Sequence, residues 1–422
     1  MKRVLLLATT TGYQTRMFEA AAARLGVEIV YATDRCEHLD DPWRDGAIAV
    51  RFHEEGHSVE AVLKALVARP VHGMIAVGDR PAVLGARVAY EMGIPAHPPE
   101  AAILARDKRL MRDRLRSAGM PVPKYFTVPV TAEADGVLAR VSWPSVIKPT
   151  VLSGSRGVIR ADDPAGFVSA FERVRRLLDS PDVRELRDPA ADLIHIESYV
   201  PGAEYAVEAV MTHGAFQPLA IFDKPDPLEG PFFEESIYVT PSRASSVAQQ
   251  GIIDAVEAAA RALGFFHGPV HAECRVNAEG VFVLEVAARP IGGLCAKVLR
   301  FVNSAGERCG LEELLLRHAL GESPGDWTRE ADASAVMMIP IPKGGIYRRV
   351  DGVAEARAVP GVEDVRITAK TDQRLVPLPE GASYLGFIFA RASTPEAAEA
   401  AVRSAQVKLR FTIDPLLGLT VK

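Results

Sequence analysis

The stretch from His271 to Arg289 decides the fold of this chain. It reads His271-Ala-Glu-Cys-Arg-Val276, then the polar break Asn277-Ala-Glu-Gly280, then Val281-Phe-Val-Leu-Glu-Val-Ala-Ala-Arg289. Both outer runs are short and rich in β-branched residues, and a turn that ends in glycine joins them, so the stretch predicts a β-hairpin. Because side chains alternate along a strand, we expect His271, Glu273 and Arg275 on one face.

Two carboxylates in this hairpin indicate a cation site. Glu285 of the second run can lie beside Glu273 of the first, although alternation alone leaves the register open. Two acidic side chains this close repel unless a positive charge lies between them, and a hard divalent cation meets that need. Arg289 adds a fork of donors suited to phosphate or carboxylate. The alternative is a solvated hairpin face on which Glu and Arg only pair.

The composition is that of an ordinary globular protein with several domains. The chain has 422 residues, of which 48% are hydrophobic and 24% charged, and this length predicts about two to four domains. The net charge of −5 argues against nucleic-acid or membrane-surface partners, because both favour a concentrated basic face.

Cysteine spacing and the first residues predict a soluble, cytoplasmic protein. The four cysteines, Cys36, Cys274, Cys295 and Cys309, show no C-x-x-C spacing, which favours free thiols in a reducing compartment. The apolar run that starts at Met1 stops at Thr9, so it indicates a buried first strand and not a signal peptide. No apolar run reaches the length of a membrane span.

The first hundred residues predict a parallel α/β unit. Strand patterns at 4–8, 27–32 and 73–77 alternate with helix patterns at 16–25, 63–68 and 81–92. The loop 9–15 after the first strand lacks G-x-G-x-x-G, so a dinucleotide-binding Rossmann fold is poorly supported.

The rest of the chain predicts further α/β segments. A basic helix over 101–118 ends at Gly119 and two prolines, which indicates a hinge. Residues 124–200 read strand, helix, strand, loop, strand, helix, strand. In the tail, a strand at 384–391, a helix capped by Thr394-Pro395 and a strand at 409–413 predict a small α/β domain.

Several groups suited to phosphate binding occur in order along the chain. Lys108 lies on a helix, Lys148 ends a strand, and the loop Leu152-Ser-Gly-Ser-Arg-Gly157 follows. The loop lacks the Walker pattern, but its small residues let backbone N–H groups approach anionic oxygens. Lys148 could reach a phosphate as a point charge. A simple hairpin turn is the alternative explanation of the loop.

This ordered set resembles the ATP-grasp superfamily of carboxylate–amine ligases. The matching elements are Arg106-Asp-Lys-Arg-Leu-Met111 with Gly119-Met-Pro-Val-Pro123, Ser145-Val-Ile-Lys-Pro149, the Gly/Ser loop, Glu197-Ser-Tyr-Val-Pro-Gly-Ala-Glu204, and Glu273 with Glu285 and Arg289. The tail Tyr384-Leu-Gly-Phe-Ile-Phe-Ala-Arg391 looks like the small closing domain of the L-amino-acid ligase branch.

The resemblance implies a domain layout. An N-terminal pre-ATP-grasp α/β domain would span 1–100, a connecting helix and hinge 101–123, and the lid subdomain 124–200. The core with the metal site would span 201–330 and the small closing domain 331–422.

The resemblance also implies roles for individual residues. Lys108 and Lys148 would contact the α- and β-phosphates of ATP, and Ser153, Gly154, Ser155 and Gly157 would form the loop over the β- and γ-phosphates. Glu197 and the backbone of Tyr199 and Val200 would lie at the adenine, and Glu204 at the ribose. Glu273 and Glu285 would hold one or two Mg²⁺ ions, or Mn²⁺ in their place, and Arg289 would steady the transferred phosphoryl group.

One position departs from the family pattern. Many ATP-grasp enzymes have Asn two residues after the second Glu as a further metal ligand, and this chain has Ala287 there. Water and phosphate oxygens can fill the shell of a magnesium ion instead, so the number of ions, one or two, stays open.

The function implied is ATP-dependent amide-bond formation through an acyl phosphate, joining an amino acid to a second amino acid or a small amine. The alternatives are a ligase similar to biotin carboxylase or glycinamide-ribonucleotide synthetase, and a nucleotide-binding module without turnover. The expected partners are small molecules, and a homodimer is compatible with the resemblance.

Four residues near these motifs each have two possible roles. His271 could bind or deprotonate the amine, or simply bond to a carboxylate beside it. Glu234, Glu235 and Tyr238 could recognise a substrate amino group, or be a solvated loop. His267, which precedes Gly268, is expected to be structural.

Overall fold

The computed structural model describes residues 1–9, 14–34 and 46–416, and its mixed α/β fold agrees with the predicted class. The chain forms two compact units, each built from three segments. Unit 1 comprises 1–122, 205–221 and 245–330, and unit 2 comprises 123–204, 222–244 and 331–422. The contiguous domains expected from the sequence differ from these units because the chain changes unit inside two strands, β9 (Ala203–Thr212) and β10 (Ala215–Lys224).

Unit 1 begins with the predicted parallel sheet. Its strand order is β3 (Ile48–Ala49), β2 (Glu28–Thr33), β1 (Arg3–Ala8) and β4 (Gly73–Val77), with α1 (Thr15–Leu25), α2 (Glu55–Ala68) and α3 (Asp79–Met92) in the connections. Gly26 and Gly93 end α1 and α3 in the left-handed conformation, where glycine has no steric penalty. Residues 10–13 of the loop after β1, and Cys36, lie outside the described residues.

The basic helix expected over 101–118 is two helices. α4 (Pro99–Arg106) and α5 (Lys108–Ser117) meet at Asp107, whose backbone is extended. The Asp107 carboxylate accepts hydrogen bonds from the N–H groups of Arg109 at 2.8 Å and Leu110 at 3.1 Å. This is a helix N-cap, which competes with continuation of the preceding helix. Lys108 therefore starts a helix, and its side chain is buried.

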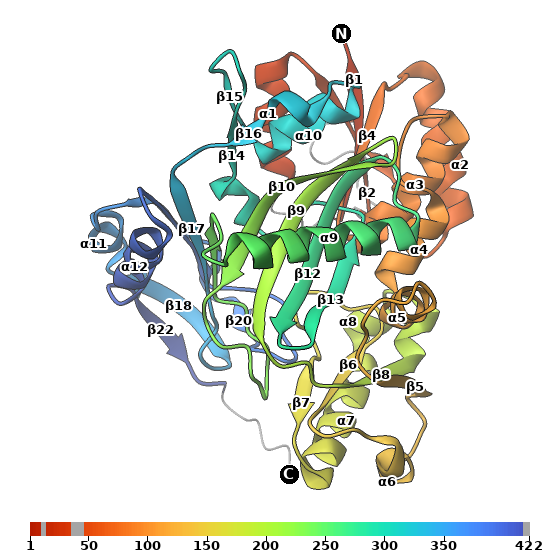
Figure 1. The fold of residues 1–422 in the computed structure, drawn as a ribbon, viewed down its shortest axis with the longest axis vertical. Helices are drawn as coiled ribbons and strands as arrows, with labels where there is room; N and C mark the ends of the chain where they lie inside the picture. The colour runs from red at the N-terminus through yellow and green to blue at the C-terminus, as the bar shows by residue number, and fades with distance from the viewer. Residues whose placement is uncertain (10–13, 35–45, 417–422) are drawn as a thin grey trace. The chain divides into compact units, whose positions relative to one another are not determined.

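The predicted hairpin belongs to a larger sheet of unit 1. In this unit the order is β13 (Gly280–Ala287), β12 (Gly268–Asn277), β9 and β10, and α9 (Ser246–Leu263) runs across β9, β12 and β13 (Figure 1). Apolar residues of α9 and of the facing strands form one core, which includes Val256, Val270, Cys274, Val283 and Val286. Unit 1 ends with β14 (Arg300–Val302), β15 (Arg308–Gly310), α10 (Leu311–Ala319) and β16 (Thr328–Arg329).

The first part of unit 2 follows the predicted order of elements. It contains β5 (Tyr125–Pro129), α6 (Ala134–Val137), β6 (Ser145–Pro149), β7 (Ile159–Ala161), α7 (Pro164–Leu178), α8 (Pro181–Arg184) and β8 (Leu193–Ser198). The strands form an antiparallel sheet in the order β5-β8-β6-β7. As expected, Asp163 caps α7, which buries Phe167, Phe171, Val174 and Leu178.

The C-terminal part of unit 2 contains the strand, helix and strand predicted near 384–391, 394–408 and 409–413. β11 (Ile237–Thr240), β17 (Ala333–Ile339), β21 (Gly386–Ala392) and β19 (Val362–Ile367) lie side by side, and α12 (Pro395–Gln406) packs on them. β18 (Gly345–Asp351), α11 (Val353–Arg357), β20 (Arg374–Leu375) and β22 (Arg410–Asp414) complete it. Thr394 caps α12 by accepting a hydrogen bond from the Ala397 N–H. Among the described helices, none is both long and apolar enough to cross a membrane.

Four histidines gather in unit 1, three of them buried. The rings of His267 and His318 stack with centroids 4.2 Å apart, and the His213 ring lies 4.7 Å from that of His267. His97 accepts from the Phe266 N–H through Nδ1 at 3.1 Å, so its Nε2 donates to the Pro269 carbonyl at 2.9 Å. This pair of bonds fixes a neutral imidazole, because the acceptor nitrogen carries no proton. His267 packs against the rings of both His213 and His318, and its structural role stays a prediction.

Burial keeps the three buried histidines neutral. It lowers the pKa of His97 to about 4 and, with repulsion from His213, that of His267 to about 4. Burial and the neighbouring histidines lower the pKa of His318 to about 3. An unfolded chain binds these protons near the ordinary pKa of 6.5, so it holds more protons than the folded chain below that pH. Stability from this cluster is thus complete above pH 6.5 and is lost as the pH falls towards 4.

We expect the melting temperature to fall between pH 6.5 and 4, and to fall less steeply in His318→Gln. Each such histidine contributes a slope of up to about 1.4 kcal/mol per pH unit to the unfolding free energy. Thermal melts of the wild type, of His318→Gln and of a control at the exposed His57 (His57→Gln) measure these slopes. Equal slopes for all three proteins would contradict the linkage.

Candidate active site

The hairpin β12–β13 places the two predicted carboxylates directly opposite each other. Glu273 pairs with Glu285 in the strand register. The next pair towards the turn is Cys274 with Val283, so Leu284 is an extra residue on β13 and forms a β-bulge.

This bulge gives Glu285 its orientation. Before the bulge, Val281 and Val283 of β13 face the apolar core beneath the sheet, and after it Val286 does. Strict alternation would have put Glu285 on the same face as Val283. The extra residue shifts the alternation of side chains by one position. Glu285 therefore faces away from the core, as Glu273 does, and bulges are known to redirect side chains in this way.

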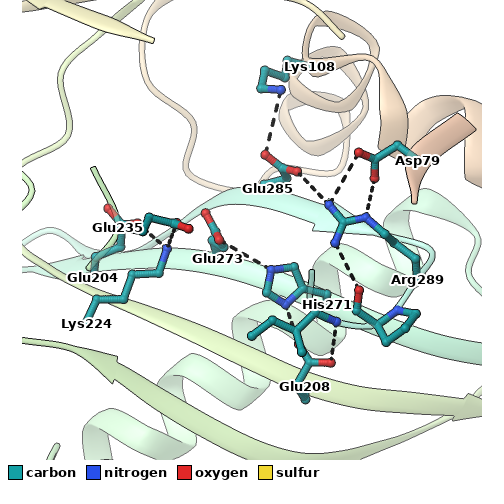
Figure 2. A network of polar contacts seen from close by, with 12 residues as sticks. Asp79, Lys108, Glu204, Glu208, Lys224, Glu235, His271, Glu273, Glu285 and Arg289 are labelled. Carbon is teal, nitrogen blue, oxygen red and sulfur yellow. Dashed lines mark hydrogen bonds and ion pairs between the residues drawn. The ribbon is translucent and has the colours of Figure 1, made fainter. Parts of the chain in front are cut away.

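Arg289 is held in place by an acid from another element of unit 1. Its Nε lies 2.7 Å from Oδ1 of Asp79, and an Nη lies 3.9 Å from Glu285 (Figure 2). Burial alone would raise the pKa of Asp79, but the Arg289 guanidinium outweighs burial, and that pKa lies below its ordinary value. Asp79 starts α3, two positions after the end of β4, and polar residues at the ends of parallel strands commonly form sites.

Lys108 approaches the same carboxylate. Its Nζ lies 3.9 Å from Glu285, and its side chain is only 10% exposed. The start of α5, set by the Asp107 cap, brings this lysine to the hairpin. Glu285 therefore has a cation on either side, Lys108 and Arg289.

His271 lies between two carboxylates. Its Nδ1 contacts Glu208 of β9, and its Nε2 lies 3.5 Å from Glu273 (Figure 2). Burial alone would lower the pKa of His271, but Glu208 and Glu273 outweigh burial and raise it to about 9. The second oxygen of Glu208 accepts from the N–H of Ile291 at 3.1 Å. Glu208 thus joins the hairpin to the loop that follows Arg289.

In unit 2, Lys148 and Glu197 form a buried ion pair across strands β6 and β8. His195 also approaches Glu197, with Nε2 at 3.3 Å. The expected residues are thus brought together, but the Lys148 ammonium is already paired with Glu197. Any phosphate bound by Lys148 would share it with this carboxylate.

The Gly/Ser loop of unit 2 has the backbone expected of an anion cradle. Gly154 and Ser155 are left-handed, with φ of 64° and 56°. The N–H groups of Ser153, Gly154 and Ser155 donate to no acceptor in the part of the chain that the structure describes. Three successive N–H groups that no protein acceptor uses are suited to anionic oxygens.

Glu204 has a partner that the sequence did not indicate. The buried Lys224 at the end of β10 lies 2.8 Å from Glu204 and 2.6 Å from Glu235. The Lys224 ammonium also lies 5.1 Å from the centre of the Tyr238 ring. The cluster of Glu204, Glu235 and Lys224 therefore carries one net negative charge.

Tyr199 and Val200, which the resemblance places at the adenine, make contacts within the protein. The Tyr199 N–H donates to the Pro144 carbonyl at 2.8 Å, so this N–H is not the one that adenine would meet. The Tyr199 ring stacks on Phe233, with centroids 6.3 Å apart, and next to it Val200 is buried. Burial raises the pKa of Glu234.

The residues present fit a divalent cation and a nucleotide phosphate. Glu273 and Glu285 offer carboxylate oxygens with side chains 20% and 24% exposed, and oxygen ligands are those that Mg²⁺ prefers. Ala287 is buried and lies opposite His271 in the register, so it supplies no third ligand.

Three site residues were missed in the sequence, and each carried a signal. Asp79 is a polar residue two positions after the end of a parallel strand. Glu208 is an acid inside the apolar run of β9 and is 1% exposed, and a buried charge requires a partner. Lys224 ends an apolar strand in the same way as Lys148.

Two family models match this chain. Residues 141–298 match the ATP-grasp domain, and residues 337–414 match the L-amino acid ligase C-terminal domain 2. The first includes the Gly/Ser loop, Glu273, Glu285 and Arg289. The second lies within the C-terminal part of unit 2.

Individual proteins agree with these models. An uncharacterised protein of Sinorhizobium fredii is 25% identical over 79% of this chain and 66% of its own length. The alanine–anticapsin ligase of Bacillus subtilis is 29% identical over 45% of this chain and 42% of its own length, so the matches span less than two thirds of these relatives. The L-amino acid ligase from Bacillus licheniformis has the same fold, with a TM-score of 0.81, 24% identity and coverage of 98% and 99% of the two chains. Residues 141–298 of this chain therefore form an ATP-grasp domain, and residues 337–414 form the C-terminal domain 2 of L-amino acid ligases.

Proposed function

We propose that this protein is an ADP-forming ligase that joins an amino acid to a second amino acid or a small amine. The observation that carries the proposal is the bulged hairpin, which presents Glu273, Glu285 and Arg289 on one face inside an ATP-grasp domain. A carboxylate of the first substrate would attack the γ-phosphate of ATP to give an acyl phosphate and ADP. The amine would then displace phosphate and form the amide bond.

Each unit has its own task in this proposal. In unit 2, Lys148 and the N–H groups of Ser153 to Ser155 would bind the phosphates, with Glu197, Tyr199 and Val200 at the adenine and Glu204 at the ribose. In unit 1, Lys108 would meet the phosphates, and Glu273 and Glu285 would hold one or two magnesium ions. Bound magnesium would neutralise phosphate charge, which phosphoryl transfer requires more than a protein nucleophile.

Arg289 would steady the transferred phosphoryl group. Asp79 fixes the guanidinium fork before any ligand binds, so little side-chain entropy is lost on binding. His271 would act as a fixed donor and not as a base, since both of its ring nitrogens face carboxylates. Its contacts would orient Glu273 and the loop that follows Arg289.

The substrate class rests on the relatives and on the C-terminal domain. The alanine–anticapsin ligase and the L-amino acid ligase named above both act on amino acids according to their names. The C-terminal match favours this branch over ligases similar to biotin carboxylase or glycinamide-ribonucleotide synthetase. Glu235 and Tyr238, beside Lys224, are candidates for contact with a substrate amino group.

We expect ADP release from Mg-ATP only when a carboxylate and an amine are both present. Pooled amino acids and small amines, followed by mass spectrometry, should give a product with the mass of their condensation. Nucleotide binding without pair-dependent turnover would instead support a nucleotide-binding module.

We expect Glu285→Gln to lower Mg-dependent ADP formation by a factor of about 100 or more, because an amide is a weaker cation ligand than a carboxylate. Glu279→Gln, in the exposed turn of the same hairpin, is the matched control and should keep wild-type turnover. Circular dichroism and melting temperature verify the fold. Wild-type turnover in Glu285→Gln would remove the metal assignment.

We expect Arg289→Lys to lower kcat about 100-fold while the KM for ATP changes less than threefold. Lysine keeps the charge beside Asp79 but loses the planar fork that matches phosphate. Alanine is less informative here, because it would leave the buried Asp79 carboxylate alone and destabilise the protein. Steady-state kinetics with varied ATP concentration measure both constants. A change confined to KM would show that Arg289 does not contact the transferred phosphoryl group.

A further inference from the structure

The Gly/Ser loop is tied to a distant segment of its own unit. The N–H of Gly157 donates to the Pro379 carbonyl at 2.7 Å, and the Nε of Arg156 donates to the Glu380 carbonyl at 2.8 Å. Both acceptors lie in the C-terminal part of unit 2, more than 200 residues along the chain from the loop. The two bonds fix the last residues of the loop, directly after the N–H groups of Ser153 to Ser155.

The segment that supplies these carbonyls is itself held by a side chain. Both oxygens of Glu380 contact Arg173 of α7, one of them at 2.9 Å from Nη2. Arg173 holds the pKa of Glu380 below its ordinary value, so the carboxylate is charged at neutral pH. A bidentate pair of this kind fixes direction as well as distance. The Glu380 side chain therefore anchors the backbone that the loop hydrogen-bonds to.

Packing fixes the other side of the loop. A Cβ at Gly157 would lie 2.8 Å from Leu177 and 2.8 Å from Pro149, and its φ is 75°, so only glycine fits there. Arg156 also contacts Asp182 of α8 at 2.5 Å. The end of the loop is thus clamped between the sheet and α7 on one side and residues 379–380 on the other.

We propose that Glu380 is a positioning residue for the phosphates of ATP, acting through Arg173 and the carbonyls that hold Arg156 and Gly157. This inference rests on the proposed function, in which the N–H groups of Ser153 to Ser155 bind those phosphates. It gives the C-terminal domain a role in nucleotide binding, besides any role in substrate choice.

The test compares Glu380→Ala, Glu380→Gln, Arg173→Ala and the double variant Glu380→Ala/Arg173→Ala. Glu355→Ala, an exposed glutamate of α11 in the same unit, is the matched control. We expect the Kd and KM for ATP to rise about tenfold in the single alanine variants, with kcat within about threefold and the melting temperature nearly unchanged. Glu380→Gln keeps one acceptor but no charge, so its Kd and KM for ATP should lie between those of the alanine variants and those of the wild type. The double variant should be no worse than the singles, because both remove one interaction.

Hydrogen exchange of the loop peptide, residues 150–160, gives a readout that does not need turnover. The Gly157 N–H should exchange faster in Glu380→Ala than in the wild type or in Glu355→Ala. Unchanged exchange and unchanged ATP affinity would overturn the inference, even if the wild type is an active ligase. ATP binding that weakens in Glu380→Ala, in a protein without pair-dependent turnover, would sustain the inference and remove the proposed function. A wild type that binds no ATP would overturn both.

Discussion

Repulsion between Glu273 and Glu285 is the constraint around which the site in unit 1 is built. Cross-strand carboxylates in direct register destabilise a hairpin unless opposite charges offset them. Here Lys108 and Arg289 flank Glu285, and His271 lies beside Glu273. With Asp79 and Glu208, four carboxylates face two permanent cations and one imidazolium, which leaves one net negative charge. Under the proposed function, a bound divalent cation would more than offset that negative charge.

The β-bulge at Leu284 makes this arrangement compatible with a folded core. The same strand must bury Val283 and Val286 and also present Glu285 on the opposite face. Regular alternation cannot do this, because the side chains of residues 283 and 285, two positions apart, would lie on the same face of the strand. One extra residue allows both orientations, although it interrupts the β12–β13 hydrogen-bond ladder locally. Deletion of Leu284 would turn either Glu285 towards the core or Val283 away from it.

Much of the fold could be predicted from local sequence, and the departures have physical causes. The hairpin, the parallel sheet and the helix at Asp163 follow from periodicity and capping residues that lie close together in the chain. The bulge could not be predicted, because Leu284 is as apolar as its neighbours and only the pairing with β12 shows it to be extra. The break at Asp107 was missed because the apolar pattern continues through it. Its signal was the aspartate itself, which can cap a helix but also occurs inside one.

The sequence indicated the candidate residues but not their partners. Glu273, Glu285, Arg289 and Lys148 stand in motifs. Asp79 at the start of α3 and Glu208 of β9 are distant from the hairpin in sequence, and only the fold brings them to it. Those partners change the chemistry that the motif residues can perform. Arg289 is fixed by Asp79, Lys148 is paired with Glu197, and Lys224 holds Glu204 and Glu235. A ligand therefore meets charges that are already oriented. It loses little binding free energy to ordering them, but it must share each one with a carboxylate. Under the proposed function, selectivity for a nucleotide over other anions would depend on how well a ligand satisfies the shared groups of each unit, which a phosphate chain with bound magnesium would do better than a single small anion.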